Sequence, residues 1–250
     1  MKTSSVFWGS SLMALLLTPP TARAQMSTDL IMETYNSNVS AITNGAINEA
    51  TMKNIAEGNS ASRTARRSTT ITTRPAVSAS TAYTPTSALR QQTVQAYVDR
   101  LKTSNPAASQ AIASVFGPGK YDYSQTYREI LKGTGLREND ATDALACYML
   151  MGWAVTHNVQ DEKAITIQMA QGVRAQIAPL LAGNAQMRNR AAQVGEELKL
   201  QTVVVQGGWQ SAIKEGKLAA YQRGINNLFK TQYGMDMSQF ALTSKGFTKQ

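Results

Sequence analysis

The stretch Asn139–Asn158 reads NDATDALACYMLMGWAVTHN, and it predicts the centre of the fold. Asn139 and Asp140 are residue types that begin helices, because their side-chain oxygens accept a hydrogen bond from a free backbone N–H of the first turn. Asp143 adds negative charge where the helix dipole favours it. The residues that follow, up to Val155, are almost all apolar, so this helix has no wide polar face for solvent. We therefore expect a helix over about residues 140–157 that is buried on all sides.

A membrane span is the alternative interpretation of this apolar run. The run covers 12 residues, from 144 to 155, whereas about 20 apolar residues are needed to cross a bilayer. Asp140, Asp143 and His157 also bracket the run too closely for a span. No second long apolar run follows residue 24, so the sequence predicts no transmembrane segment in the processed chain.

The first 24 residues have the composition of a secretory signal peptide. Lys2 provides a short basic region, residues 12–17 are apolar, and Ala22-Arg23-Ala24 forms a small-x-small cleavage site. We expect cleavage after Ala24 and export of the product, to the periplasm or out of the cell. Cys147 is the single cysteine, so the chain cannot form an intramolecular disulfide and must be stabilised by its packed core.

Two polar segments follow the signal. Residues 25–57 offer at most one short amphipathic helix. Residues 58–86 are rich in Ser, Thr, Ala and Arg and have no hydrophobic periodicity, which predicts a disordered linker. The formal net charge of the whole chain is +9, and the excess lies in this linker and in the C-terminal third.

From residue 87 to residue 246, apolar residues recur at helical spacing and are separated by Gly, Pro, Asn and Asp. The pattern predicts one all-α domain of five to seven helices, wrapped around the central helix. We expect a break or kink at Gly207-Gly208 and an irregular tail after Gly234, docked by Met237, Phe240 and Leu242. The other helices are expected to begin near Ser87, Pro106, Tyr123, Asp161, Ala185 and Trp209.

The residue types needed for several chemistries are missing. His157 is the single histidine, so no zinc site can be assembled from histidines and cysteines. It follows Cys147 by 10 residues, or about 15 Å along a helix, which rules out a catalytic pair. Neither a P-loop nor a GxGxxG or Gly-x-Ser-x-Gly motif occurs, so the sequence predicts no metal and no cofactor.

A polar cluster beside the start of the central helix is the candidate site. Glu129, Asp140 and Asp143 could act as an acid and a base on a glycan. Helix capping, dipole stabilisation and a surface pair between Arg128 and Glu129 explain the same residues without catalysis. The tyrosines of this region could line a ligand groove or could anchor helices by packing; they are Tyr121, Tyr123, Tyr127 and Tyr148.

The same region carries a family resemblance. The run Tyr121-Asp122-Tyr123, Gly135-Leu136, Asn139-Asp140-Ala141, Ala144-Leu145 and Trp153, with Tyr127 and Tyr148, resembles a family of exported bacterial proteins known as a domain of unknown function. The likeness covers roughly residues 87–246. It implies a bacterial, exported, all-helical domain, and it implies no catalytic residues.

Three functions fit these observations. The leading hypothesis is a non-enzymatic, exported helical module that binds a protein, a peptide or an envelope polymer. The alternatives are an enzyme that cleaves cell-wall glycan through Glu129 with Asp140 or Asp143, and a carrier of a small apolar ligand held between the central helix and its neighbours. The linker arginines could attract nucleic acid, but the export signal and the lack of interleaved aromatic residues disfavour it. The sequence does not indicate an oligomeric state.

Overall fold

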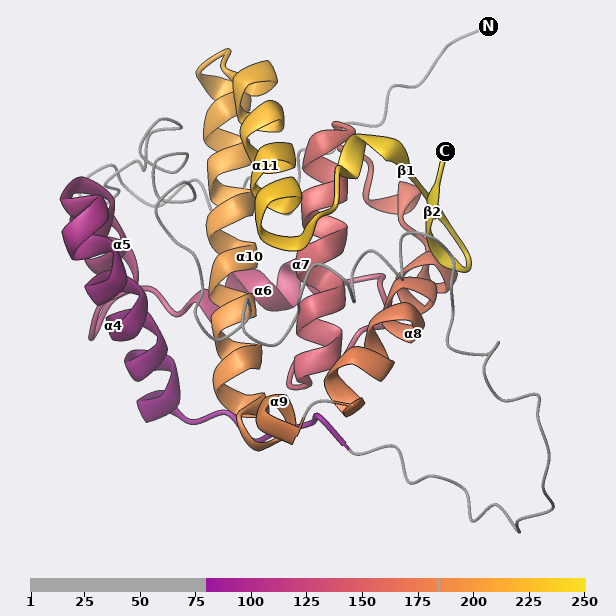
Figure 1. Cartoon of the computed structure of the whole chain (residues 1–250). Coiled ribbons are helices and arrows are strands. Elements are labelled where there is room, and N and C mark those ends of the chain that lie inside the picture. The colour runs from indigo at the N-terminus through magenta and orange to yellow at the C-terminus, as the bar shows by residue number, and fades with distance from the viewer. Residues whose placement is uncertain (1–79, 184) are drawn as a thin grey trace, which may run out of the picture.

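A computed structural model describes residues 80–183 and 185–250, and the expected signal peptide, residues 25–57 and most of the expected linker lie outside this range. The described part is an all-α domain with one small hairpin (Figure 1). Its elements are α4 (Ser87–Ser104), α5 (Pro106–Phe116), α6 (Tyr123–Leu131), α7 (Ala141–Thr156), η3 (Glu162–Ala164), α8 (Ile167–Gly183), α9 (Ala185–Asn189), α10 (Ala191–Lys214), α11 (Leu218–Tyr233), η4 (Met237–Gln239), β1 (Phe240–Thr243) and β2 (Gly246–Lys249).

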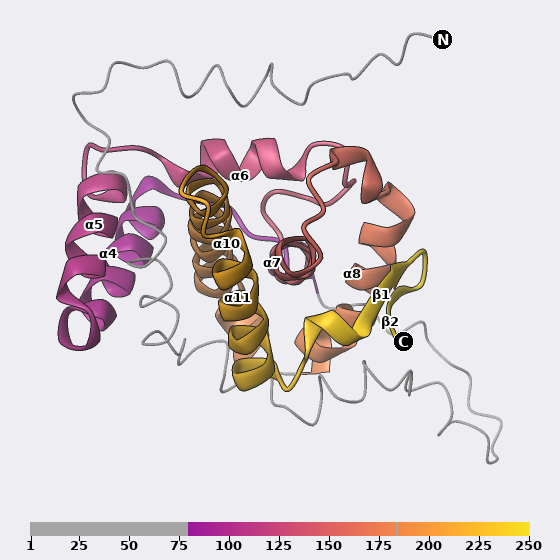
Figure 2. The same ribbon diagram turned by 90° about the horizontal axis from the view of Figure 1, so that it is seen from above.

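Helix α7 is the central helix that the sequence predicts. Asp140 caps it, because its Oδ1 accepts hydrogen bonds from the backbone N–H groups of Thr142 at 2.9 Å and Asp143 at 3.2 Å. Fourteen of its 16 residues are buried. Figure 2 shows α7 end-on, with α10 and α11 on one side, α8 and the hairpin on the other, and α6 lying crosswise along the top of the view. Asn158 follows the helix in a left-handed conformation, with φ of 53°.

Helices α4 and α5 form an outer pair that packs against α10 (Figure 2). Asn105 joins them: its backbone N–H donates to the carbonyl of Leu101, and its side chain accepts from the N–H of Ala108 at 2.9 Å. Pro106 stands at the first position of α5, where its missing N–H costs nothing. One residue therefore ends one helix and starts the next, and the second helix begins at Pro106 as the sequence predicts.

The prediction of a break at Gly207-Gly208 is wrong. Helix α10 is continuous through both glycines. A glycine weakens a helix by about 1 kcal/mol relative to alanine but keeps its N–H, so tertiary packing can hold it in a helix. The buried face of α10 supplies that packing, and it also keeps the β-branched run of residues 203–205 helical.

The expected start of the next helix at Asp161 is also wrong. Asp161 caps the short η3 turn by accepting from the N–H of Lys163 at 2.9 Å. Helix α8 begins at Ile167, where the Thr166 hydroxyl accepts from the N–H of Met169 at 3.3 Å. The helix then continues through Pro179 to Gly183.

The C-terminal tail is a β-hairpin and not an irregular segment. β1 and β2 pair antiparallel, with Leu242 opposite Phe247. The side-chain amide of Gln176 on α8 completes the outer edge of β2: it donates to the carbonyl oxygen of Phe247 at 2.9 Å and accepts from its N–H at 2.8 Å. The expected docking residues Met237, Phe240 and Leu242 are buried.

The folded domain begins before residue 87, where the sequence places the end of the linker. Residues 81–83 lie across the start of α7: the N–H of Ala141 donates to the carbonyl of Thr81, and the N–H of Tyr83 donates to the carbonyl of Asn139, both at 3.0 Å. Adding a Cβ at Gly195 would bring it within 2.4 Å of the Tyr83 ring. The last part of the expected linker is thus a strap packed on the domain.

Among the described helices, none combines the length and the apolar content that a bilayer crossing requires. This agrees with the interpretation of α7 as a core helix.

Candidate functional site

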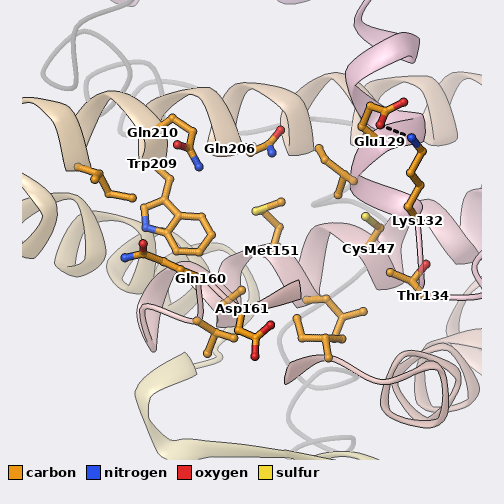
Figure 3. A pocket seen from close by; sticks show the side chains of 16 residues that line it. Glu129, Lys132, Thr134, Cys147, Met151, Gln160, Asp161, Gln206, Trp209 and Gln210 are labelled. Carbon is orange, nitrogen blue, oxygen red and sulfur yellow. Dashed lines mark hydrogen bonds and ion pairs between the residues drawn. The ribbon is translucent and has the colours of Figure 1, made fainter. Parts of the chain in front are cut away.

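A cavity of about 290 Å³ lies between α6, α7, α10 and the loop that precedes α8 (Figure 3). Of the 16 residues that line it, nine have apolar or thiol side chains: Ile130, Cys147, Leu150, Met151, Ala154, Val159, Ile165, Trp209 and Ile213. The remaining seven are polar: Glu129, Lys132, Thr134, Gln160, Asp161, Gln206 and Gln210. Lys132, Gln160 and Asp161 are exposed, so polar groups surround the entrance to a mostly apolar interior.

Two helices present matched faces to this cavity. Helix α7 contributes positions 147, 150, 151 and 154, and α10 contributes positions 206, 209, 210 and 213. Both sets follow the i, i+3, i+4, i+7 spacing that places side chains on one face of a helix. Because small or slender side chains stand at several of these positions, the two faces do not fill the space between the helices.

Cys147 contributes the thiol of the cavity wall. The residue is buried, and burial raises the pKa of its thiol to about 12. The neighbouring Tyr127 hydroxyl acts in the opposite direction but does not offset this effect. The thiol therefore stays protonated near neutral pH and behaves as an apolar wall group, not as a nucleophile.

The carboxylates singled out from the sequence have structural partners. Asp140 and Asp143 are both 1% exposed. Asp140 accepts from the Arg137 Nη2 at 2.6 Å, and Asp143 accepts from the Arg137 Nε at 2.9 Å and from Arg174 on α8. The hydrogen bond to Asp143 raises the pKa of Arg137. Asp140 caps α7, Asp143 fastens α8 to it through Arg174, and neither carboxylate lines the cavity.

Glu129 differs from the two aspartates because it does line the cavity. Its carboxylate pairs with Lys132 one turn later; the Lys132 side chain is largely exposed to solvent, and that of Glu129 is 36% exposed. The predicted pair between Arg128 and Glu129 is wrong, since Arg128 lies beside Glu138 at 3.4 Å. Asp161 is the other carboxylate of the lining, and it caps η3.

The candidate tyrosines pack in the core or at its edge. Tyr123, Tyr127 and Tyr148 are at most 1% exposed, and the half-buried Tyr121 shares a hydrogen bond with Thr126 at 2.8 Å. None of these four side chains lines the cavity. The structure thus favours the anchoring role of the tyrosines over a ligand groove.

Sequence reasoning missed a second buried polar network, centred on Glu196. Its carboxylate accepts from the hydroxyls of Tyr83 at 2.8 Å and Tyr123 at 2.6 Å and from the Lys199 Nζ at 2.6 Å. Lys199 also donates to the Asn139 side chain at 2.8 Å. Burial lowers the pKa of Lys199 and raises the pKa values of Tyr83 and Tyr123, and the Glu196 charge adds to the rise at the tyrosines.

The Glu196 network holds elements together and is not a ligand site. It joins the strap, α6, the start of α7 and α10, and none of its members lines the cavity. The one signal in the sequence was a group of charges at positions 196, 197 and 199, next to the apolar residues Leu198, Leu200 and Val203 of α10. The i, i+3 spacing of positions 196 and 199 is typical of a solvent-exposed ion pair, so the pattern gives no indication that they are buried.

No family model matches the chain, and no curated protein or solved structure is similar to it. The resemblance to an exported bacterial family therefore stays a prediction. The candidate site is defined by the cavity and its lining alone.

Proposed function

We propose that this protein is a non-enzymatic carrier that holds a small, mostly apolar ligand in the cavity between α7 and α10. The cavity itself supports this proposal. Its volume of about 290 Å³ is roughly twice that of the ~150 Å³ apolar cavity known to admit benzene. Ligand pockets typically combine an apolar wall with a few polar groups, as the lining residues do here.

The two other hypotheses have less support. Glycan cleavage needs two carboxylates free to exchange protons with substrate, whereas Asp140 and Asp143 are buried against arginines. Docking of a protein partner usually uses an apolar surface patch. Within residues 80–183 and 185–250, Ile167 is the large hydrophobic side chain that is exposed, so no such patch supports a docking module.

We also propose that the carrier works outside the cytoplasm, on the basis of the signal-like first 24 residues. A ligand of this kind dissolves poorly in water. A protein without a catalytic set but with an apolar cavity suits its transport or storage in an exported compartment.

Titration with the neutral fluorescent probe N-phenylnaphthylamine tests the proposal. We expect saturable binding of one probe per chain. Ala154→Leu places three more carbons in the cavity wall and should weaken binding at least tenfold. Ala219→Leu is the matched control, because it makes the same change on the exposed side of α11 and should leave binding unchanged.

Two results would contradict the proposed carrier function. Wild-type protein that shows no saturable binding, or an Ala154→Leu variant that folds and binds as well as wild type, would exclude the cavity as the binding site. Native mass spectrometry of protein purified from its source supplies an independent observation, and a bound small molecule is expected.

A further inference from the structure

The indole N–H of Trp209 is a buried hydrogen-bond donor in the wall of the cavity. Trp209 is 6% exposed, and its Nε1 finds no acceptor within the described part of the chain. Leaving a buried donor unsatisfied destabilises the folded protein. By contrast, Trp153, at the edge of the core, donates its Nε1–H to the carbonyl of Phe240 at 2.8 Å. A buried donor in a cavity wall, without an acceptor in the described part of the chain, can be satisfied by an acceptor atom on a bound ligand.

The position of Trp209 directs this donor to one end of the cavity. The residue stands on the face of α10 that lines the cavity. Figure 3 shows the nitrogen edge of the indole turned toward the end where Gln160 lies, away from Cys147 and Thr134. In a ligand that fills the length of the cavity, the apolar part would thus contact α7. The end of the ligand near Gln160 would meet the indole N–H.

The charges of the lining favour a neutral ligand. Lys132 is the single cation among the 16 lining residues, and it is already paired with Glu129. Asp161 adds another negative charge at the rim. A carboxylate or phosphate ligand would therefore enter a site without a free cation, which is costly for an ion transferred from water.

We propose that the ligand is a neutral, mostly apolar molecule that carries one carbonyl or ether oxygen, and that this oxygen accepts the Trp209 Nε1–H. The cavity has roughly twice the volume of the one that admits benzene, so it suits a ligand of about two to three rings in size, a range that includes N-phenylnaphthylamine. This inference rests on the proposed carrier function and assigns its ligand class. Trp209 is then the residue that selects for the oxygen.

Two nearly isosteric probes separate the oxygen from the apolar body. Methyl naphthyl ketone carries a C=O where isopropenylnaphthalene carries a C=CH₂. Competition of each against N-phenylnaphthylamine gives their affinity ratio in wild type and in Trp209→Phe. We expect the ketone-to-hydrocarbon ratio to fall at least tenfold in Trp209→Phe, which removes the N–H but keeps an aromatic ring.

A proton–nitrogen correlation spectrum of the wild-type protein gives a readout that needs no variant. The indole N–H signal of Trp209 should move downfield on addition of the ketone and less on addition of the hydrocarbon. The signal of Trp153, already bonded to Phe240, should stay in place in both cases.

The outcomes distinguish the two proposals. The ratio of ketone affinity to hydrocarbon affinity could be equal in wild type and in Trp209→Phe, with no ketone-specific movement of the Trp209 signal. That result would overturn the proposed ligand class and would not contradict the carrier function. Failure of both probes and of N-phenylnaphthylamine to bind would overturn the carrier as well. If Trp209→Phe does not fold, the wild-type spectrum decides.

Discussion

At the scale of single residues, burial separates carboxylates that look alike in the sequence. Asp143 is 1% exposed and accepts hydrogen bonds from Arg137 and Arg174, whereas Glu129 shares an exposed pair with Lys132. A buried carboxylate with several charged donors contributes to folding, and an exposed pair contributes little because solvent screens it.

We expect Asp143→Asn to lower the free energy of unfolding by about 1.5–3 kcal/mol, the range for hydrogen bonds to charged groups. The loss stays below that of a fully buried pair because Arg137, 55% exposed, can return to water. Glu129→Gln is the control, with an expected change within about 0.5 kcal/mol. Urea unfolding at pH 7 measures both, and equal effects would contradict the assigned roles.

Cys147 should react slowly for the same reason of burial. With a thiol pKa of about 12, the thiolate fraction at pH 8 is about a thousandfold below that of an ordinary cysteine. We expect labelling by a disulfide reagent to be slower than that of a free thiol by at least this factor. In guanidinium chloride, one thiol per chain should react at once. Fast labelling of the folded protein would show that the thiol is not buried.

At the scale of elements, close backbone approach fixes the hairpin on α8. A Cβ built at Gly172 would lie 2.4 Å from the backbone nitrogen of Gly246 and 2.5 Å from the carbonyl oxygen of Ser244. These are backbone atoms, so no side-chain rotation relieves the clash. The hairpin can therefore dock only where α8 carries a glycine, and Gln176 then pairs with its edge.

Two glycine-to-alanine changes should have opposite effects on the free energy of unfolding. Gly172→Ala should destabilise the protein by more than 1 kcal/mol and loosen the hairpin, because the clash exceeds the gain in helix propensity. Gly207→Ala meets no atom within 4 Å and should stabilise α10 by up to about 1 kcal/mol. Urea midpoints measure both, and hydrogen exchange at Phe247 reports on the hairpin. A stabilising Gly172→Ala would exclude the close approach.

At the scale of the whole molecule, buried tyrosines couple the fold to alkaline pH. Burial raises the pKa values of five tyrosines above 10.0: Tyr83, Tyr123, Tyr127, Tyr148 and Tyr221. Above pH 10 the unfolded chain releases these protons while the folded chain keeps them, so stability falls as pH rises. The lowered pKa of Lys199 has the opposite effect on the pH dependence of stability, but it concerns one proton.

We therefore expect cooperative alkaline unfolding that begins slightly above pH 10. Each buried tyrosine contributes a loss of about 1.4 kcal/mol per pH unit, so five together can exhaust a typical domain stability within one to two pH units. Tyrosinate absorbance should rise in one main step that coincides with loss of helical circular dichroism. Gradual ionisation before any loss of helix would contradict this coupling.

The sequence by itself determined most of the helices and the centre of the fold. Apolar spacing identified most helices, the Asn105-Pro106 pair placed a helix junction, and the length of the apolar run identified α7 as a core helix. These features depend on contacts within a few residues along the chain. The local sequence is therefore enough to predict them.

Only the tertiary structure decided which polar groups are buried and where the cavity lies. The Glu196–Lys199 pair reads as a surface pair until α6, α10 and the strap enclose it. The cavity needs α7 and α10, about 60 residues apart in sequence, to face each other without filling the space between them. The hairpin needs Gly172 and Gln176 of α8. Each feature depends on long-range packing, which periodicity along one chain segment does not encode.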